Sequence, residues 1–163
     1  MYSYKSQRNH AKARLEDINV SFKDLCAVCD NIRHMRVQDA IMFLSLAKDM
    51  RIPVYYRRWN KKLGARKELK GKKGRYPQKA AKYVLKLLKS AVANAEQKDL
   101  DVENLYIAHI AANKKNIYPR LAPKGRRVIQ NLETARIELV LEELALKSKV
   151  KENNEDIKKE GKS

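Results

Sequence analysis

Apolar residues recur at the spacing of an α-helix in three segments of the chain, and each helix is expected to bury one face. The first should begin near Asp24, a residue type that favours the N-cap position. Its buried side is predicted to carry Leu25, Val28, Cys29 and Ile32. The second should run from Val37 to about Met50. Its apolar stripe of Val37, Ala40, Ile41, Leu44 and Ala47 is widened by Phe43, Leu46 and Met50, so this helix should be mostly buried.

The third segment gives the strongest helical pattern, from Pro77 at the first helical position to about Lys98. Its predicted core-facing residues are Ala80, Ala81, Val84, Leu87, Leu88, Ala91 and Ala95. Lysines occupy the opposite side, which indicates a helix with one face in solvent.

Alternating apolar and polar residues predict three strands. The first is INVSF, residues 18–22, followed by LYIAHIAA at 105–112 and RIELVLE at 136–142. If the last two strands continue toward each other, residues 112–135 form a long hairpin arm. A two-stranded arm exposed to water is marginally stable by itself, so a partner outside the chain should hold it.

The pattern breaks down between Pro53 and Tyr76, where Gly64, Gly71 and Gly74 punctuate a strongly basic stretch. We expect a loop with no regular element of its own. A loop of this length in a compact domain is usually functional or disordered.

The length of 163 residues suits one domain with a modest core. We expect a basic N-terminal arm over residues 1–12, a single domain over 13–145 and a charged tail over 146–163. No stretch resembles a signal peptide or approaches the roughly 20 apolar residues of a membrane span, which predicts a soluble intracellular protein without membrane insertion.

The charge balance is the feature of the composition that bears most on function. Lysine and arginine total 37 against 19 acidic residues, which gives a net charge of +18. Like charges destabilise a compact state, so the excess points to a polyanionic partner, with nucleic acid first. An anionic membrane surface is the main rival, but only one Trp and two Phe are available for an amphipathic membrane helix.

The sequence gives little indication of a catalytic site or a metal site. Cys26 and Cys29 form a CxxC spacing, but Cys29 lies on an apolar helix face, and a zinc site would need two more ligands from His10, His34 and His109. Buried structural thiols are the favoured interpretation, and His109 is expected to be structural as well. We predict no catalytic site, no metal and no cofactor.

The cations of the two loops are less well explained as solvated charges. Tyr55, Tyr56, Trp59, Tyr76 and Tyr118 lie among them and could stack on exposed bases, while the glycines allow close approach of the backbone to phosphates. A phosphate at the helix start near Pro77 would also complement the helix dipole. The predicted RNA-binding residues are Arg57, Arg58, Trp59, Lys61, Lys62, Arg66, Lys70, Lys72, Lys73, Arg75, Tyr76, Lys79, Lys114 and Lys115.

Four stretches together resemble one family, the large-subunit ribosomal protein numbered twenty-two in bacteria and seventeen in eukaryotes, in its archaeal and eukaryotic form. They are VSFKDLCAVCDNIRHMRVQDAIMFL, IPVYYRRWNKK, GRYPQKAAKYVLKLLKSAVANAEQKDLDVENLYIAHI and RIELVLEE. The resemblance runs from about Ile18 to Glu143 and is most specific at LLKSAVANAE.

This resemblance implies an α+β fold: three helices on a three-stranded antiparallel sheet, with a long protruding hairpin and basic extensions. It implies a non-enzymatic constituent of the cytoplasmic large ribosomal subunit, bound to rRNA and neighbouring ribosomal proteins. The hairpin would thread through rRNA and meet the nascent polypeptide in the exit tunnel. The implied tip residues are Arg120, Lys124, Gly125, Arg126 and Arg127.

Two other functions stay open at the level of sequence. A free-standing RNA-binding or RNA-chaperone protein could use the same loops. A small metal or redox enzyme could be built on Cys26 and Cys29.

Overall fold

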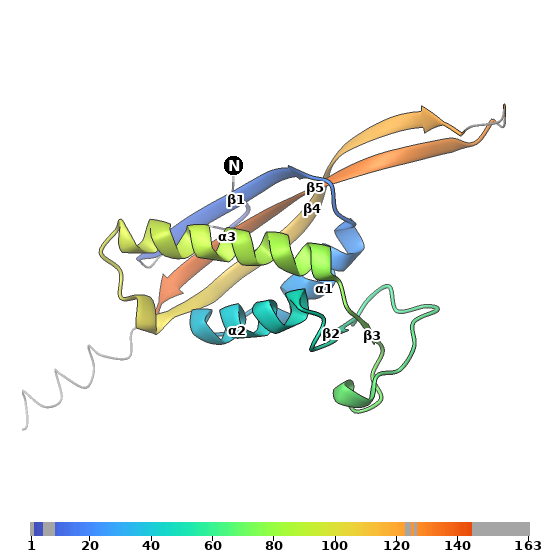
Figure 1. Cartoon of the computed structure of the whole chain (residues 1–163). Helices are drawn as coiled ribbons and strands as arrows, with labels where there is room; N and C mark the ends of the chain where they lie inside the picture. Colours follow the sequence, from blue (N-terminus) through green and yellow to red (C-terminus); the bar gives the residue numbers. More distant parts are fainter. Residues whose placement is uncertain (1, 5–8, 123–124, 126, 145–163) are drawn as a thin grey trace, which may run out of the picture.

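Three long strands form an antiparallel sheet in the order β1–β5–β4, and three helices cover one of its faces (Figure 1). The computed structural model describes residues 2–4, 9–122, 125 and 127–144. The elements in chain order are β1 (His10–Ile18), α1 (Phe22–Ile32), α2 (Val37–Lys48), β2 (Val54–Tyr55), the short 3-10 turn η1 (Lys67–Leu69), β3 (Gly74–Arg75), α3 (Gln78–Glu96), the 3-10 turn η2 (Val102–Asn104), β4 (Leu105–Leu121) and β5 (Ile129–Glu143). This arrangement confirms the α+β fold with a long hairpin.

Helix α3 packs on the sheet and on α2, and its buried face is the one that the sequence predicts. All seven predicted core residues of α3 are buried. Four of them are alanines, whose small side chains allow a close approach of the helix to its neighbours. The predicted core residues of α1 are also all buried, and its apolar face packs against β4.

The predicted strand at 18–22 is wrong. The strand is β1, which begins at His10 within the expected arm, and Ser21 already occupies the N-cap of α1. Alanines mark the buried side of β1 and give only a weak strand pattern, but pairing with β5 places Ala11 beside Leu141 and Ala13 beside Leu139. Tertiary pairing therefore overrides the local pattern. Asp24 lies in the first turn of α1 instead of capping it.

Helix α2 begins and ends close to the predicted bounds, but it is less buried than expected. Val37, Ala40, Leu44 and Ala47 are buried. Met42 is 65% exposed, and Met50, which lies beyond the end of the helix, is 56% exposed. The reason is that α2 packs chiefly against α3, so its remaining sides are left to solvent (Figure 1).

The hairpin of β4 and β5 continues well beyond the helices (Figure 1). The two strands remain paired from Leu105 beside Glu143 to Leu121 beside Ile129, with irregularities after Ile107 and after Lys114. Large apolar side chains on this distal part are exposed, with Leu121 at 74%. The far half of the hairpin therefore lacks a core of its own.

Residues 2–4 lie across the sheet face that points away from the helices. Ser3 donates hydrogen bonds to the buried carboxylate of Glu138, Tyr4 stacks on His109, and Tyr2 lies beneath the cations of Lys12 and Arg14. Burial by itself raises the pKa of Glu138, but hydrogen bonds from Ser3 and His109 outweigh it and hold the pKa below its usual value.

Candidate nucleic-acid interface

The basic loop, residues 57–75, is folded back on itself. Val54 pairs with Arg75 and Tyr55 with Gly74, so β2 and β3 close the base of the loop. Further in, the N–H of Arg66 donates to the carbonyl of Lys72, and a turn with Lys70 and Gly71 at positive φ reverses the chain. The expectation of a loop with no element of its own is therefore wrong, because short ribbons and η1 organise it.

Gly74 makes this closed base possible. A Cβ at Gly74 would lie 2.8 Å from the carbonyl oxygen of Val54 and 2.5 Å from Cδ1 of Leu69. The first of these contacts is with backbone, which cannot move aside without breaking the β2–β3 pairing. Any larger side chain must therefore disturb the loop.

We expect Gly74→Ala to loosen the basic loop at a cost of about 1–3 kcal/mol. Limited proteolysis should then cut the segment between Arg57 and Lys73 faster than in the wild type. Gly64→Ala is the matched control, because a Cβ there meets no atom within 4 Å. Equal cleavage of the two variants would show that close packing at Gly74 does not hold the loop.

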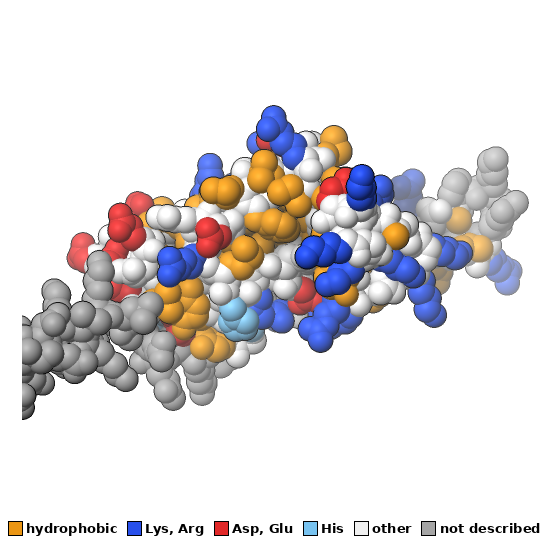
Figure 2. Space-filling view, turned by 90° about the horizontal axis from the view of Figure 1, so that it is seen from below, with side chains coloured by type: hydrophobic (Ala, Val, Ile, Leu, Met, Phe, Trp, Pro, Cys, Tyr) orange, Lys and Arg blue, Asp and Glu red, His pale blue; other side chains and the backbone are white. Residues whose placement is uncertain are grey.

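Most of the predicted cations project into solvent from this folded loop and from the start of α3. Figure 2 shows Lys and Arg side chains gathered toward the end of the molecule that carries the basic loop and the hairpin, with acidic side chains toward the other end. The predicted cations exposed here are Arg57, Arg58, Lys61, Lys62, Lys70, Lys72, Lys73, Arg75 and Lys79. Glu68 is the only acidic residue between Arg57 and Lys79.

Several aromatic residues hold the loop instead of facing solvent. Tyr56 is 2% exposed, and its hydroxyl donates to Asp24 at 2.6 Å, so the expectation that it stacks on bases is wrong. Burial and this bond raise the pKa of Tyr56. Arg66 lies over the ring of Tyr76 and donates to the Gly74 carbonyl, while Lys72 lies over the ring of Tyr55. Trp59 and Tyr118 remain exposed.

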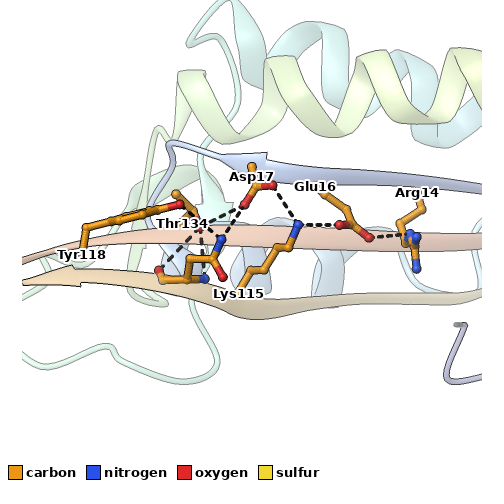
Figure 3. A network of polar contacts seen from close by, with 7 residues as sticks. Arg14, Glu16, Asp17, Lys115, Tyr118 and Thr134 are labelled. Carbon is orange, nitrogen blue, oxygen red and sulfur yellow. Dashed lines mark hydrogen bonds and ion pairs between the residues drawn. The ribbon is translucent and has the colours of Figure 1, made fainter.

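The predicted residues Lys114 and Lys115 lie at the root of the hairpin, where both are engaged in ion pairs within the chain. Lys115 lies 2.5 Å from Glu16 and 2.7 Å from Asp17 (Figure 3). Lys114 pairs with Glu133 across the hairpin. Asn116 and Thr134 bond to Asp17 from the two strands of the hairpin. These bonds tie both hairpin strands to the end of β1, so Lys115 serves to position the hairpin.

The pKa values at the root follow from these contacts. The hydrogen bond from Lys115 lowers the pKa of Glu16, and the bonds to Asp17 and Glu16 raise the pKa of Lys115. The contribution of Glu16 is therefore present above the carboxyl's unfolded pKa and is lost as pH falls through its lowered folded value. The contribution of Lys115 is lost only as pH rises through its raised folded value.

We expect Lys115→Met to increase the motion of the distal hairpin at neutral pH, and acidification to do the same in the wild type. The measurement is ¹⁵N relaxation at residues 117–121 and 129–132. Lys114→Met is the matched control, because it removes a pair internal to the hairpin and leaves the tie to β1 intact. Unchanged relaxation in Lys115→Met would contradict a positioning role.

At the hairpin tip, Arg120 and Arg127 are exposed, and Gly125 adopts a positive φ of 66°. The N–H of Ala122 donates to the carbonyl of Val128 and closes the described strands. Lys124 and Arg126 lie outside the described residues. The arms therefore carry exposed cations on both sides of the tip.

The two cysteines are buried and unpaired. Burial raises the pKa of the Cys26 thiol to about 11 and raises that of Cys29 as well, so both thiols are protonated at neutral pH. Within the described residues, no three His, Cys, Asp or Glu side chains come together as a metal site would require.

None of the described helices is both long enough and apolar enough to cross a membrane.

The structure adds one residue to the candidate interface that the sequence did not indicate. Asp30 binds both Arg33 and Arg58 at 3.2 Å and thereby fixes the start of the basic loop to α1. The i,i+3 spacing of Asp30 and Arg33 is a signal that could have indicated the first pair. Nothing local could have indicated Arg58, which is 28 residues away.

The sequence is similar to those of known proteins. The sequence profile of the family described as ribosomal protein L22p/L17e matches residues 13–142. The chain is 42% identical over 149 residues to large ribosomal subunit protein uL22 of Methanosphaera stadtmanae, covering 87% of this chain and 96% of that protein. It is 43% identical over 146 residues to the uL22 protein of Methanocaldococcus jannaschii and 40% identical over 146 residues to that of Archaeoglobus fulgidus, covering 86% of this chain and 94% of each relative.

Proposed function

The chain belongs to the ribosomal protein L22p/L17e family, and on that premise we propose that it is a structural constituent of the large ribosomal subunit that binds rRNA. Its action is to hold RNA segments in place and involves no catalysis. The relatives named above are large-subunit proteins, and the chain spans nearly their full length. The place of action is then the cytoplasmic ribosome.

The observation that carries the proposal is the exposure of loop lysines that have no acidic partner among the described residues. Lys61, Lys62, Lys70 and Lys73 project from a loop that the fold holds in one shape. Such a surface repels itself until phosphates approach it, because each neutralised phosphate relieves repulsion and releases counterions. Lysine and arginine on a rigid loop contact mainly the RNA backbone, so RNA shape selects the site.

The start of α3 supports the same partner. Its first turn holds Gln78, Lys79 and two alanines and no acidic residue, so no side chain of that turn offsets the positive end of the helix dipole. Lys79 and Arg75 flank this end and are exposed. A backbone phosphate placed here would meet the helix dipole and both cations.

The hairpin is proposed to pass between RNA segments and to line the exit tunnel near its tip. Ile117, Tyr118, Leu121 and Ile129 are each at least half exposed on a two-stranded ribbon. Apolar groups on such a ribbon are stable when a partner covers them. The tip, with Arg120 and Arg127, would meet rRNA and the nascent polypeptide, while the body contacts neighbouring ribosomal proteins.

The test is co-sedimentation of the full chain with large subunits after a high-salt wash of native particles. An integral constituent should remain with the particle, because its hairpin and loop are enclosed by folded RNA. A free-standing RNA-binding or chaperone protein would leave in the wash, since its contacts are electrostatic and open to solvent. Release of the chain at this step would contradict the proposal.

A further inference from the structure

A cavity of about 280 Å³ lies between α1, β4 and the start of the basic loop. Buried small groups, among them Cys26, Cys29 and Ala112, make its apolar part. Phe22, Trp59 and Asn113 line it as well. The volume lies just below the range typical of pockets for drug-sized ligands, so it suits one flat ring system.

Trp59 is held at this cavity in an unfavourable backbone conformation. Its φ is +52°, in the left-handed region that bulky residues avoid. The indole meets the ring of Phe22 edge-on at 5.6 Å, and the guanidinium of Arg58 lies 5.1 Å from the indole centroid. With 39% exposure, the indole also offers surface to a partner. Strain of this kind concentrates at binding sites, where the surrounding structure maintains it.

The charges at the cavity favour a neutral ring over a phosphate. Asp30 accepts from Arg33 and Arg58, both at 3.2 Å, so a carboxylate already offsets part of the charge of the two guanidinium groups. Arg33 also donates to the carbonyl of Ile110. The apolar part of the cavity would desolvate a phosphate without compensation. The side chain of Arg58 is 61% exposed and stays within reach of a phosphate outside the cavity.

Resting on the RNA-binding role proposed above, we infer that this cavity takes one unstacked nucleobase of the bound RNA. The base stacks on Trp59 and on the guanidinium planes beside it. Cys26 and Cys29 then form the apolar floor, which gives the CxxC spacing a packing role in recognition. The lysines of the loop thus contact the RNA backbone, and the start of the loop binds one base.

Trp59 is the only tryptophan of the chain, so its emission reports directly on the cavity. The full chain is titrated with an RNA stem–loop that has unpaired loop bases, and with a fully paired duplex of equal phosphate number. We expect the stem–loop to quench Trp59 and the duplex to leave its emission unchanged. This titration uses the unmodified protein and does not depend on the folding of any variant.

Affinity measurements on variants give the second part of the test. Trp59→Ala should weaken stem–loop binding about 5- to 150-fold with the salt slope unchanged, and Trp59→Phe should recover most of the loss. Lys62→Ala is the matched control from the same loop. It should weaken stem–loop and duplex alike and reduce the salt slope by about 1.

Equal quenching by duplex and stem–loop, or equal loss of affinity for both in Trp59→Ala, would overturn the inference, because Trp59 would then sense only the backbone. Unchanged emission and affinity would overturn it too. In either case a steep salt slope would leave the proposed RNA-binding role standing. Salt-independent binding of both RNAs would contradict that role instead.

Discussion

Replacing Lys61, Lys62, Lys70, Lys72 and Lys73 with glutamine is expected to lower the salt slope of rRNA binding by about 3.5 to 4.5. Each of these lysines is exposed on the folded loop, and each neutralised phosphate contributes about 0.7 to 0.9 to the slope. If the non-electrostatic part of binding is unchanged, affinity at 0.1 M salt falls by roughly a thousandfold or more. Filter binding of the full chain to large-subunit rRNA over a range of KCl concentrations measures both quantities.

The matched control removes the same number of charges from the helices. Lys23, Lys48, Lys82, Lys86 and Lys89 are exposed on α1, α2 and α3, outside the loop. Their replacement by glutamine should change the slope far less, because these lysines are not part of the proposed interface. If the control loses as much affinity as the loop variant, net charge governs binding and the loop is not the site.

Deleting residues 119–128 is expected to leave the body folded and to widen the exit tunnel in the assembled subunit. In the described residues, Tyr118 to Leu121 pair with Ile129 to Leu132 and are exposed, so the core loses nothing. The deletion joins Tyr118 to Ile129 and leaves residues 129–131 to connect the paired Tyr118 and Leu132. Hairpins tolerate connections of this length.

Two measurements check this deletion. Thermal unfolding by circular dichroism should match the wild type, whereas the core variant Leu88→Ala should lose about 2–5 kcal/mol as a reference for a damaged body. Cryo-electron microscopy of subunits that carry the deletion should show a wider tunnel beside the missing tip. Tunnel density identical to that of the wild type would count against a tunnel-lining tip.

Features whose signal is local can be predicted from the sequence, whereas features that depend on a distant partner cannot. The buried face of α3 was predicted in full because helical periodicity is written into consecutive residues. Strand β1 was missed because its buried alanines signal little until β5 pairs with them. The pairing of β2 with β3 requires a residue without a Cβ at position 74. This requirement cannot be seen in the sequence, because it arises only when the carbonyl of Val54 lies beside Gly74 in the folded chain.

The same distinction applies to the candidate interface. Exposure of the loop lysines could be predicted from their density, since so many cations cannot be buried. The engagement of Lys115 could not, because its partners Glu16 and Asp17 lie about a hundred residues earlier in the chain. The role of Tyr56 could not be predicted for a related reason. Its partner Asp24 lies on another element, and the hydrogen bond to Asp24 keeps Tyr56 buried, where it cannot stack on a base.

The most direct test is a cryo-electron microscopy map of the native large subunit that contains the full chain. The proposed function requires RNA backbone density against the basic loop and against Arg120 and Arg127 of the hairpin, with the apolar residues of the hairpin covered. Lysines of the loop facing open water in that map, with no nucleotide beside them, would contradict the account.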